Sequence, residues 1–165
     1  MEFLRWIEES GFSQWVREAD SLFAFPGILL LHTLGMGLVV GINATFNLRV
    51  LGFAPGIKLR GFQKFFPIMW IGFWINAITG TILLAINALK MTHNPDFYVK
   101  LVFIALAVVN FQMLKRRVFG PSSKGDESGL PANVKILAVT SLILWIGAIT
   151  CGRLLAYVGR STGSF

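Results

Sequence analysis

The sequence is dominated by four apolar stretches, each long enough to cross a lipid bilayer as a helix. A spanning helix needs about 20 predominantly apolar residues, and the four stretches cover residues 21–46, 65–89, 97–114 and 135–158. All eight Asp and Glu residues lie outside them. Because short connections place consecutive helices antiparallel, we predict an all-α fold, a four-helix transmembrane bundle with up-down topology.

The composition indicates an integral membrane protein that is surrounded by the lipid bilayer. Hydrophobic residues make up 55% of the chain and charged residues only 14%, against about 25% charged residues in a soluble domain. The bases behind the net charge of +7 gather at the ends of the apolar stretches, where they contact lipid headgroups, so we expect no nucleic-acid partner. The single cysteine, Cys151, excludes an internal disulfide and a multi-cysteine metal site.

The basic residues also predict the orientation in the membrane. The connections over residues 47–64 and 115–134 are rich in Lys and Arg, whereas the link over residues 90–96 carries chiefly Lys90. Lys and Arg are enriched in cytoplasmic loops. We therefore expect the first and third connections in the cytoplasm, and both termini and the 90–96 turn on the outer side.

Residues 1–20 predict an amphipathic segment that lies at the membrane surface and breaks at Gly11, and residues 159–165 form a short tail. In the first span, Gly37 and Gly41 form a small-xxx-small pair, a pattern that lets helices approach closely. The boundary signals are Asp20 or Ser21 as the N-cap of the first span, Pro26 within its first turns, and Pro95 at a first helical position.

His32 is the residue that bears most directly on chemistry. It lies near mid-depth of the first span, where an ionisable group is costly and usually functional. A neutral imidazole is an ordinary ligand of haem or copper, and Gly35 removes bulk on nearly the same face, as a flat macrocycle requires. The alternative interpretation is a histidine hydrogen-bonded to Asn, Ser or Thr on a neighbouring helix, with Gly35 serving close helix packing.

Other polar residues toward the outer side extend this hypothesis. His93 is the only candidate for a second histidine ligand, and is otherwise a solvated residue at the interface. Lys100 and Arg153 would neutralise haem propionates, or else extend to the headgroups without a partner. Copper is the rival metal, because His32 and Met36 share a helix face and an imidazole with a thioether suits Cu(I).

Patterns typical of enzymes are absent from the sequence. There is no Ser-His-Asp set, phosphate-binding glycine loop, zinc spacing or pair of carboxylates within a span. The lack of any intramembrane carboxylate also argues against a proton-coupled transporter. An electron-transfer or structural role is therefore favoured over an enzymatic one.

Several segments, in this order, resemble a bacterial family of small four-helix membrane proteins that is catalogued as a domain of unknown function. The resemblance covers nearly the whole chain, and it implies the four-helix fold, the membrane location and the "HTLG" and "GR" features at His32 and Arg153. This chain departs from the family at Asn47, where Asp is usual, and after Asn110, where a histidine is frequent and this chain has Lys115 instead. The segments are "WIEESGFSQWVREADSLFAFPGILLLHTLGMGLVVG", "NLRVLG", "GFWINAITGTILL", "NPDFYVKLVFIALAVVN" and "LILWIGAITCGRLLAY".

The resemblance implies no established activity, but it implies a bacterial inner membrane. With the orientation expected from the basic residues, both termini are then periplasmic. A looser similarity connects the chain to four-helix haem-b and copper-resistance membrane proteins. Our leading prediction is a haem-b-binding electron-transfer subunit of a larger membrane complex or homo-oligomer. The alternatives are a cofactor-free structural or assembly subunit and a copper-handling membrane protein. The predicted site comprises His32 and His93 as metal ligands, with Gly35, Lys100 and Arg153 around the cofactor.

Overall fold

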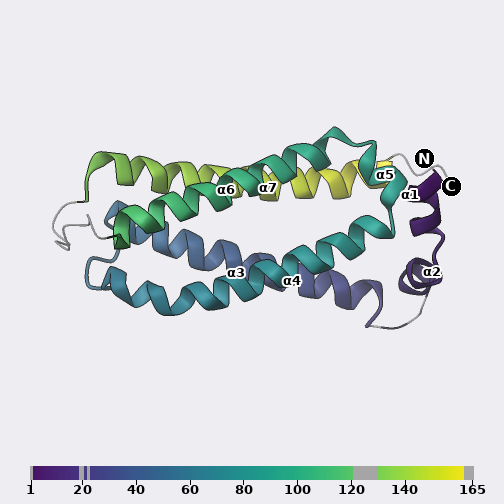
Figure 1. Ribbon diagram of the computed structural model, residues 1–165, viewed down its shortest axis with the longest axis horizontal. Helices are drawn as coiled ribbons and strands as arrows, with labels where there is room; N and C mark the ends of the chain where they lie inside the picture. Colours follow the sequence, from purple (N-terminus) through teal and green to yellow (C-terminus); the bar gives the residue numbers. More distant parts are fainter. Residues whose placement is uncertain (1, 19–20, 22, 121–129, 162–165) are drawn as a thin grey trace.

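The computed structural model confirms the predicted all-α fold (Figure 1). Four long helices form the bundle: α3 (Phe25–Leu51), α4 (Phe66–Ala85), α6 (Pro95–Phe119) and α7 (Ala132–Ser161). All four are long and apolar enough to cross a membrane, α4 together with the 3₁₀ turn before it. The chain is therefore a multi-pass membrane protein suited to a lipid bilayer. The structure describes residues 2–18, 21, 23–120 and 130–161.

The first span begins later and ends later than its apolar stretch. Helix α3 has Pro26 in its first turn, as predicted, but its N-cap is Ala24. The predicted N-cap Ser21 instead accepts a hydrogen bond from the backbone N–H of Phe23, 3.2 Å away, and so begins a turn that precedes the helix. The other predicted cap, Asp20, lies outside the described residues.

The C-terminal part of α3 continues through polar residues to Leu51. The following Gly52 has a φ of 108°, and its N–H bonds to the carbonyl of Arg49 at 3.1 Å. Only glycine adopts this left-handed conformation without strain, and it is the usual residue just past a helix end. The predicted end at residue 46 was too early, because Asn47 stays in the helix, where its Nδ2 donates to Oδ1 of Asn43 one turn earlier.

The second predicted span, residues 65–89, is divided in the structure. A 3₁₀ turn, η1 (Leu59–Phe65), leads into α4, which ends at Ala85, and a short helix, α5 (Ala88–Thr92), follows. The break lies at Asn87, whose φ of −136° and ψ of 38° leave the helical region. As predicted, α6 begins at Pro95, and the side chain of Asn94 caps it.

The N-terminal segment forms two short helices, α1 (Glu2–Glu8) and α2 (Gly11–Glu18). They lie across one end of the bundle beside α5 (Figure 1). The predicted break near Gly11 is confirmed, because α2 begins at that residue. The expected apolar face is split, since Val16 is buried whereas Phe12 and Trp15 are exposed. We call the end that holds α1, α2 and α5 the N-terminal end, and the end that holds η1 the η1 end.

The bundle consists of two helical hairpins, α3 with α4 and α6 with α7, and α3 also packs along α7 (Figure 1). At the η1 end the hairpins are joined by phenylalanine rings. Phe46 of α3 is fully buried and stacks on Phe119 of α6 with ring centroids 5.8 Å apart. It also lies edge-on to Phe66 of α4 at 5.5 Å and to Phe111 of α6 at 6.4 Å. This aromatic cluster joins the two hairpins at the η1 end.

Candidate functional site

His32 is hydrogen-bonded to the neighbouring helix α4. Its Nδ1 lies 3.1 Å from the backbone carbonyl oxygen of Asn76 and 3.0 Å from the hydroxyl of Thr79. In return, Nδ2 of Asn76 donates to the carbonyl oxygen of His32 at 2.8 Å. Because a carbonyl oxygen only accepts, Nδ1 carries the proton in this contact, and the lone pair of the neutral ring is on Nε2.

Gly35 lies where α3 and α4 approach each other closely. A Cβ atom at Gly35 would lie 2.8 Å from the carbonyl oxygen of Gly72 and 2.9 Å from the backbone nitrogen of Asn76. Gly72 faces Gly35 reciprocally, since a Cβ there would lie 3.0 Å from the Gly35 carbonyl oxygen. The backbones of the two helices therefore nearly touch. Gly35 serves helix packing, and α4 occupies the space that a macrocycle would need on this face.

The His32 ring itself also packs against a glycine of α4. A Cβ atom at Gly80 would lie 3.1 Å from Cε1 of His32. Hydrogen bonds to Asn76 and Thr79 together with the contact at Gly80 hold the imidazole in one orientation. Such anchoring of Nδ1 on a backbone carbonyl is also how proteins orient a histidine that binds a metal through Nε2.

Lys100 belongs to α6, in the other hairpin, and packs against α7. Its Nζ and Cε would each lie 3.5 Å from a Cβ atom at Gly152, so the lysine side chain lies along α7 inside the bundle. Its ammonium is within range of electrostatic interaction with the His32 ring. No ion pair of Lys100 with a carboxylate occurs among the described residues. Of the predicted site, the structure brings together His32, Gly35 and Lys100.

The remaining predicted site residues lie elsewhere. His93 is exposed at the C-terminal cap of α5, and its Nδ1 lies 2.7 Å from the carbonyl oxygen of Leu89. Arg153 is exposed on α7. Met36, considered with His32 for copper, is partly buried one turn further along α3. Within the described part of the chain, no group of three or more His, Cys, Asp or Glu residues is placed to hold a metal ion.

The residues present fit haem b only in part. The Nε2 atom of His32 and the ammonium of Lys100 have the chemistry of an axial ligand and a propionate partner. The face of α3 at Gly35, however, is closed by Gly72 and Asn76, so it provides no cradle for the macrocycle. A site with His32 as its single histidine ligand, bonding through Nε2, is the form that these contacts leave.

A buried polar cluster near the middle of the bundle was largely missed by sequence reasoning. In this cluster the hydroxyl of Ser141 donates to Oδ1 of Asn43 at 2.9 Å, and Nδ2 of Asn47 donates to the same oxygen at 2.6 Å. In the sequence, Asn110 is an amide within an apolar stretch and therefore needs a partner, but Asn43 and Ser141 gave no signal beyond being polar within such stretches. The cluster consists of Asn43, Asn47, Asn110, Ser141 and Trp145, each at most 8% exposed.

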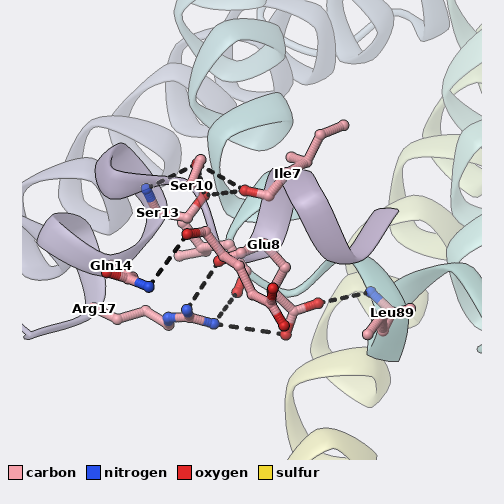
Figure 2. A network of polar contacts seen from close by, with 9 residues as sticks. Ile7, Glu8, Ser10, Ser13, Gln14, Arg17 and Leu89 are labelled. Carbon is pink, nitrogen blue, oxygen red and sulfur yellow. Dashed lines mark hydrogen bonds and ion pairs between the residues drawn. The ribbon is translucent and has the colours of Figure 1, made fainter. Parts of the chain in front are cut away.

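A second polar network ties the N-terminal helices to the bundle (Figure 2). The carboxylate of Glu8 accepts a hydrogen bond from the backbone N–H of Leu89 at 3.0 Å. The guanidinium of Arg17 donates to the carbonyl oxygen of Ile86 at 3.2 Å. These contacts supply partners for backbone groups at the break between α4 and α5. The hydroxyls of Ser10 and Ser13 both donate to the carbonyl of Ile7 and close the turn between α1 and α2.

Comparison with known proteins gives no further assignment. Neither the models of protein families, nor the curated proteins, nor the solved structures contain a match to this chain. The resemblance to the bacterial four-helix family therefore stays a prediction. The function has to be argued from the contacts of this chain alone.

Proposed function

We propose that the protein is a structural or assembly subunit of a membrane complex, which associates with partner helices through α3. Gly37 and Gly41 carry this proposal, because both are exposed and a Cβ atom at either would meet nothing within 4 Å. A glycine inside a helix costs about 1 kcal/mol relative to alanine. Nothing within the described chain uses the space that these two glycines leave, whereas a partner helix would.

The residues one turn beyond the glycines extend this surface. Thr33 and Thr45 are also exposed and follow the same spacing of four residues. Each threonine hydroxyl donates to a carbonyl oxygen within α3, Thr33 to Leu29 at 2.9 Å and Thr45 to Gly41 at 2.7 Å, so neither needs a further partner. Small residues repeated every four positions let two membrane helices approach closely. The partner is a second copy of this chain or another membrane subunit.

The contacts of His32 are consistent with this role. Its hydrogen bonds to Asn76 and Thr79 lock α3 to α4 and fix the rotation of α3. That rotation turns Gly35 inward and Gly37 outward. The residue that most suggested chemistry thereby determines which face of α3 is offered to a partner.

We place the protein in a bacterial inner membrane with both termini in the periplasm. The support is the excess of Lys and Arg in the connections over residues 47–64 and 115–134, since such residues favour the cytoplasmic side. In that orientation the N-terminal end of the bundle, with α1, α2 and α5, faces the periplasm. The test is to place a cysteine at Ile57 or at His93, both of which are exposed, and to treat intact cells with a membrane-impermeant thiol reagent. In this orientation the reagent labels the cysteine at position 93 and not the one at position 57.

Association through α3 is tested by bulky substitution. Native gels of mildly solubilised wild-type membranes should show a complex, and the double variant Gly37→Leu, Gly41→Leu should lose it, because two leucines keep a partner helix away. The matched control is Ala105→Leu, which adds a leucine at an exposed small residue of α6 and should leave the complex intact. A monodisperse monomer from wild-type membranes, or a complex that survives the double variant, would overturn the proposal.

The second candidate function is electron transfer with haem b, and the orientation of His32 together with the proximity of Lys100 favours it. Bound haem supplies a reversible one-electron change at its iron. In this chain His32 would hold it through Nε2, and Lys100 would neutralise a propionate. The N–H at Nδ1 would stay on the Asn76 carbonyl and keep the ring in place.

An absorption spectrum decides between the candidates. For a haem protein, the purified chain shows a Soret band that shifts on reduction, is lost in His32→Ala and is kept in His93→Ala. His93 is a suitable control because it is exposed and bonded only within α5. A wild-type protein without a Soret band, or a band that persists in His32→Ala, rejects this candidate. Metal analysis of the same samples tests the copper alternative with Met36.

A further inference from the structure

We propose that the buried polar cluster binds water inside the membrane-spanning bundle, at the joint between the two hairpins. Three side-chain atoms of the described chain are buried without any hydrogen-bond partner in the protein: Oδ1 of Asn47, Oδ1 of Asn110 and Nε1 of Trp145. All three belong to this cluster. A buried polar group without a partner is destabilised by about 1–3 kcal/mol, and such groups in natural proteins are nearly always satisfied by protein or ordered water.

The helices place the three atoms around one level of the bundle. Ser141 of α7 bonds to Asn43 of α3, which sets that level for these two helices. On α6, Phe103 lies against Gly147 and Lys100 against Gly152 of the antiparallel α7. Continuing this register along both helices brings Asn110 beside Ser141.

Trp145 and Asn47 lie one turn from this level on opposite sides, but both side chains lean toward it. Side chains of a helix tilt toward its N-terminus. For Trp145 of α7 that direction is the level of Ser141, and for Asn47 of α3 it is the level of Asn43. The tilt of Asn47 is visible in its 2.6 Å hydrogen bond to Oδ1 of Asn43.

The kinds of atom left without a partner identify the ligand. The two amide oxygens accept hydrogen bonds, whereas the indole N–H donates one. A metal cation bonds to the oxygens but is repelled by the N–H, and an anion has the opposite preference. Water both donates and accepts, and a buried water typically makes about three hydrogen bonds to otherwise unsatisfied groups.

The packing at this level leaves room for a molecule of that size. A cavity of about 20 Å³ lies beside the cluster, bordered by apolar atoms of Asn43 and Trp145 and by apolar side chains of the four helices, among them Val39, Phe73 and Val108. A water needs at least about 10–15 Å³ in this measure.

The consequence for the fold is that α3 and α7 meet at this level through water as well as through side chains. Next to the joint, toward the η1 end, the hairpins meet through aromatic rings, whereas at the joint α3 and α7 meet through polar side chains. A water there satisfies atoms from both hairpins at once. It therefore adds to the contact between α3 and α7 without requiring apolar complementarity.

Proton-detected solid-state NMR of the full chain in deuterated lipid tests the proposal on the wild-type protein. The indole N–H of Trp145, assigned by its loss in Trp145→Phe, should show magnetisation transfer from water. Trp74 provides the control, because its side chain is exposed on the lipid-facing surface of α4 and its indole should receive none at that depth. Absence of transfer to Trp145 would overturn the proposal.

Thermal unfolding of a variant gives a second, independent test. Replacing an orphaned amide by a similar-sized apolar side chain stabilises a protein, whereas replacing one that is bonded to water destabilises it. We therefore expect Asn110→Leu to lower the unfolding midpoint, and the control Val109→Leu, at the exposed neighbouring position, to leave it unchanged. A raised midpoint in Asn110→Leu would contradict the proposal. A rise in the wild-type midpoint on exchanging choline chloride for sodium or potassium chloride would also overturn it, in favour of a cation.

Discussion

Glu8 and Arg17 form an ion pair with 3.6 Å between Oε1 and Nη1. Each also bonds to a backbone group at the break between α4 and α5. The carboxylate lies at the N-terminus of α5, and the guanidinium lies at the C-terminus of α4. A helix N-terminus favours negative charge and a C-terminus favours positive charge. The pair thus matches both helix ends at the break and fixes α1 and α2 against the bundle (Figure 2).

The first prediction concerns the hydrogen bond between the carboxylate of Glu8 and the backbone N–H of Leu89 in α5. In Glu8→Ala the amide of Leu89 loses its acceptor, so its hydrogen exchange should accelerate. Because Glu8 is partly exposed, we expect roughly a tenfold change, equivalent to about 1.4 kcal/mol. The exposed neighbour Glu9, changed to alanine, is the control and should leave Leu89 unaffected. Equal exchange at Leu89 in Glu8→Ala and wild type would contradict the contact.

A second prediction distinguishes two glycines of α3 that lie half a turn apart. Gly35→Ala places a methyl group 2.8 Å from the Gly72 carbonyl, and such overpacking should destabilise the protein by about 1–3 kcal/mol. Gly37→Ala meets nothing within 4 Å and should stabilise it by up to about 1 kcal/mol. Unfolding midpoints in detergent measure both. If the two variants behaved alike, α3 would be rotated differently from this structure.

The third prediction addresses the hydrogen bonds of His32. Thr79→Val keeps the side-chain shape but removes the hydroxyl that lies 3.0 Å from Nδ1. Hydrogen bonds between membrane helices contribute about 0.6 kcal/mol on average, so we expect a loss of that order. In a double-mutant cycle with His32→Phe, most of this loss of stability should appear as coupling energy between the two side chains. A coupling energy near zero would mean that the two side chains do not interact.

A fourth prediction tests the aromatic cluster that joins the hairpins. Phe46 is fully buried among rings of both hairpins, so Phe46→Ala should cost about 3–5 kcal/mol of stability. Phe53 lies just beyond α3 and is 65% exposed, and Phe53→Ala serves as the control with little expected effect. Chemical denaturation in mixed micelles measures the difference, and comparable losses in the two variants would show that the aromatic cluster does not join the hairpins.

The fifth prediction concerns Arg49, which is only 7% exposed. Its guanidinium donates to the carbonyl oxygens of Ile57 and Pro55 and so closes the connection between α3 and η1. Arg49→Met keeps the length of the side chain but removes both donors, and limited proteolysis within residues 52–58 should become faster. Arg60→Met, at an exposed position of η1, should leave cleavage unchanged. Unchanged cleavage in Arg49→Met would show that these bonds do not order the connection.

Local signals in the sequence predicted the parts of the fold that depend on neighbouring residues. Pro95 marked the start of α6, and the break near Gly11 was placed correctly. The division of the second span at Asn87 was not foreseen, because the apolar residues continue past it. The break is tolerated there because Glu8 and Arg17, which lie some 70–80 residues away in the chain, bind the backbone groups on either side.

The sequence predicted which residues could belong to the candidate site, but not which of them lie close together. His32 and Lys100 were singled out because an ionisable group within a span is unusual, and the structure brings them near each other. His93 and Arg153 were grouped with them on depth alone, but both are exposed. Depth follows from position along a helix, whereas contact also requires the helix to be rotated toward its neighbour.

By itself, the sequence determined the membrane environment, the four spans and the up-down order, because these follow from the length of apolar stretches and from short connections. The tertiary structure alone decided how each helix is rotated about its axis. Gly35 faces α4 while Gly37 faces outward, and His32 finds its acceptor on Asn76, 44 positions further along the chain. Rotation depends on how surfaces from distant segments interlock, and in lipid, where apolar faces are equally well solvated all round, hydrophobicity cannot specify it.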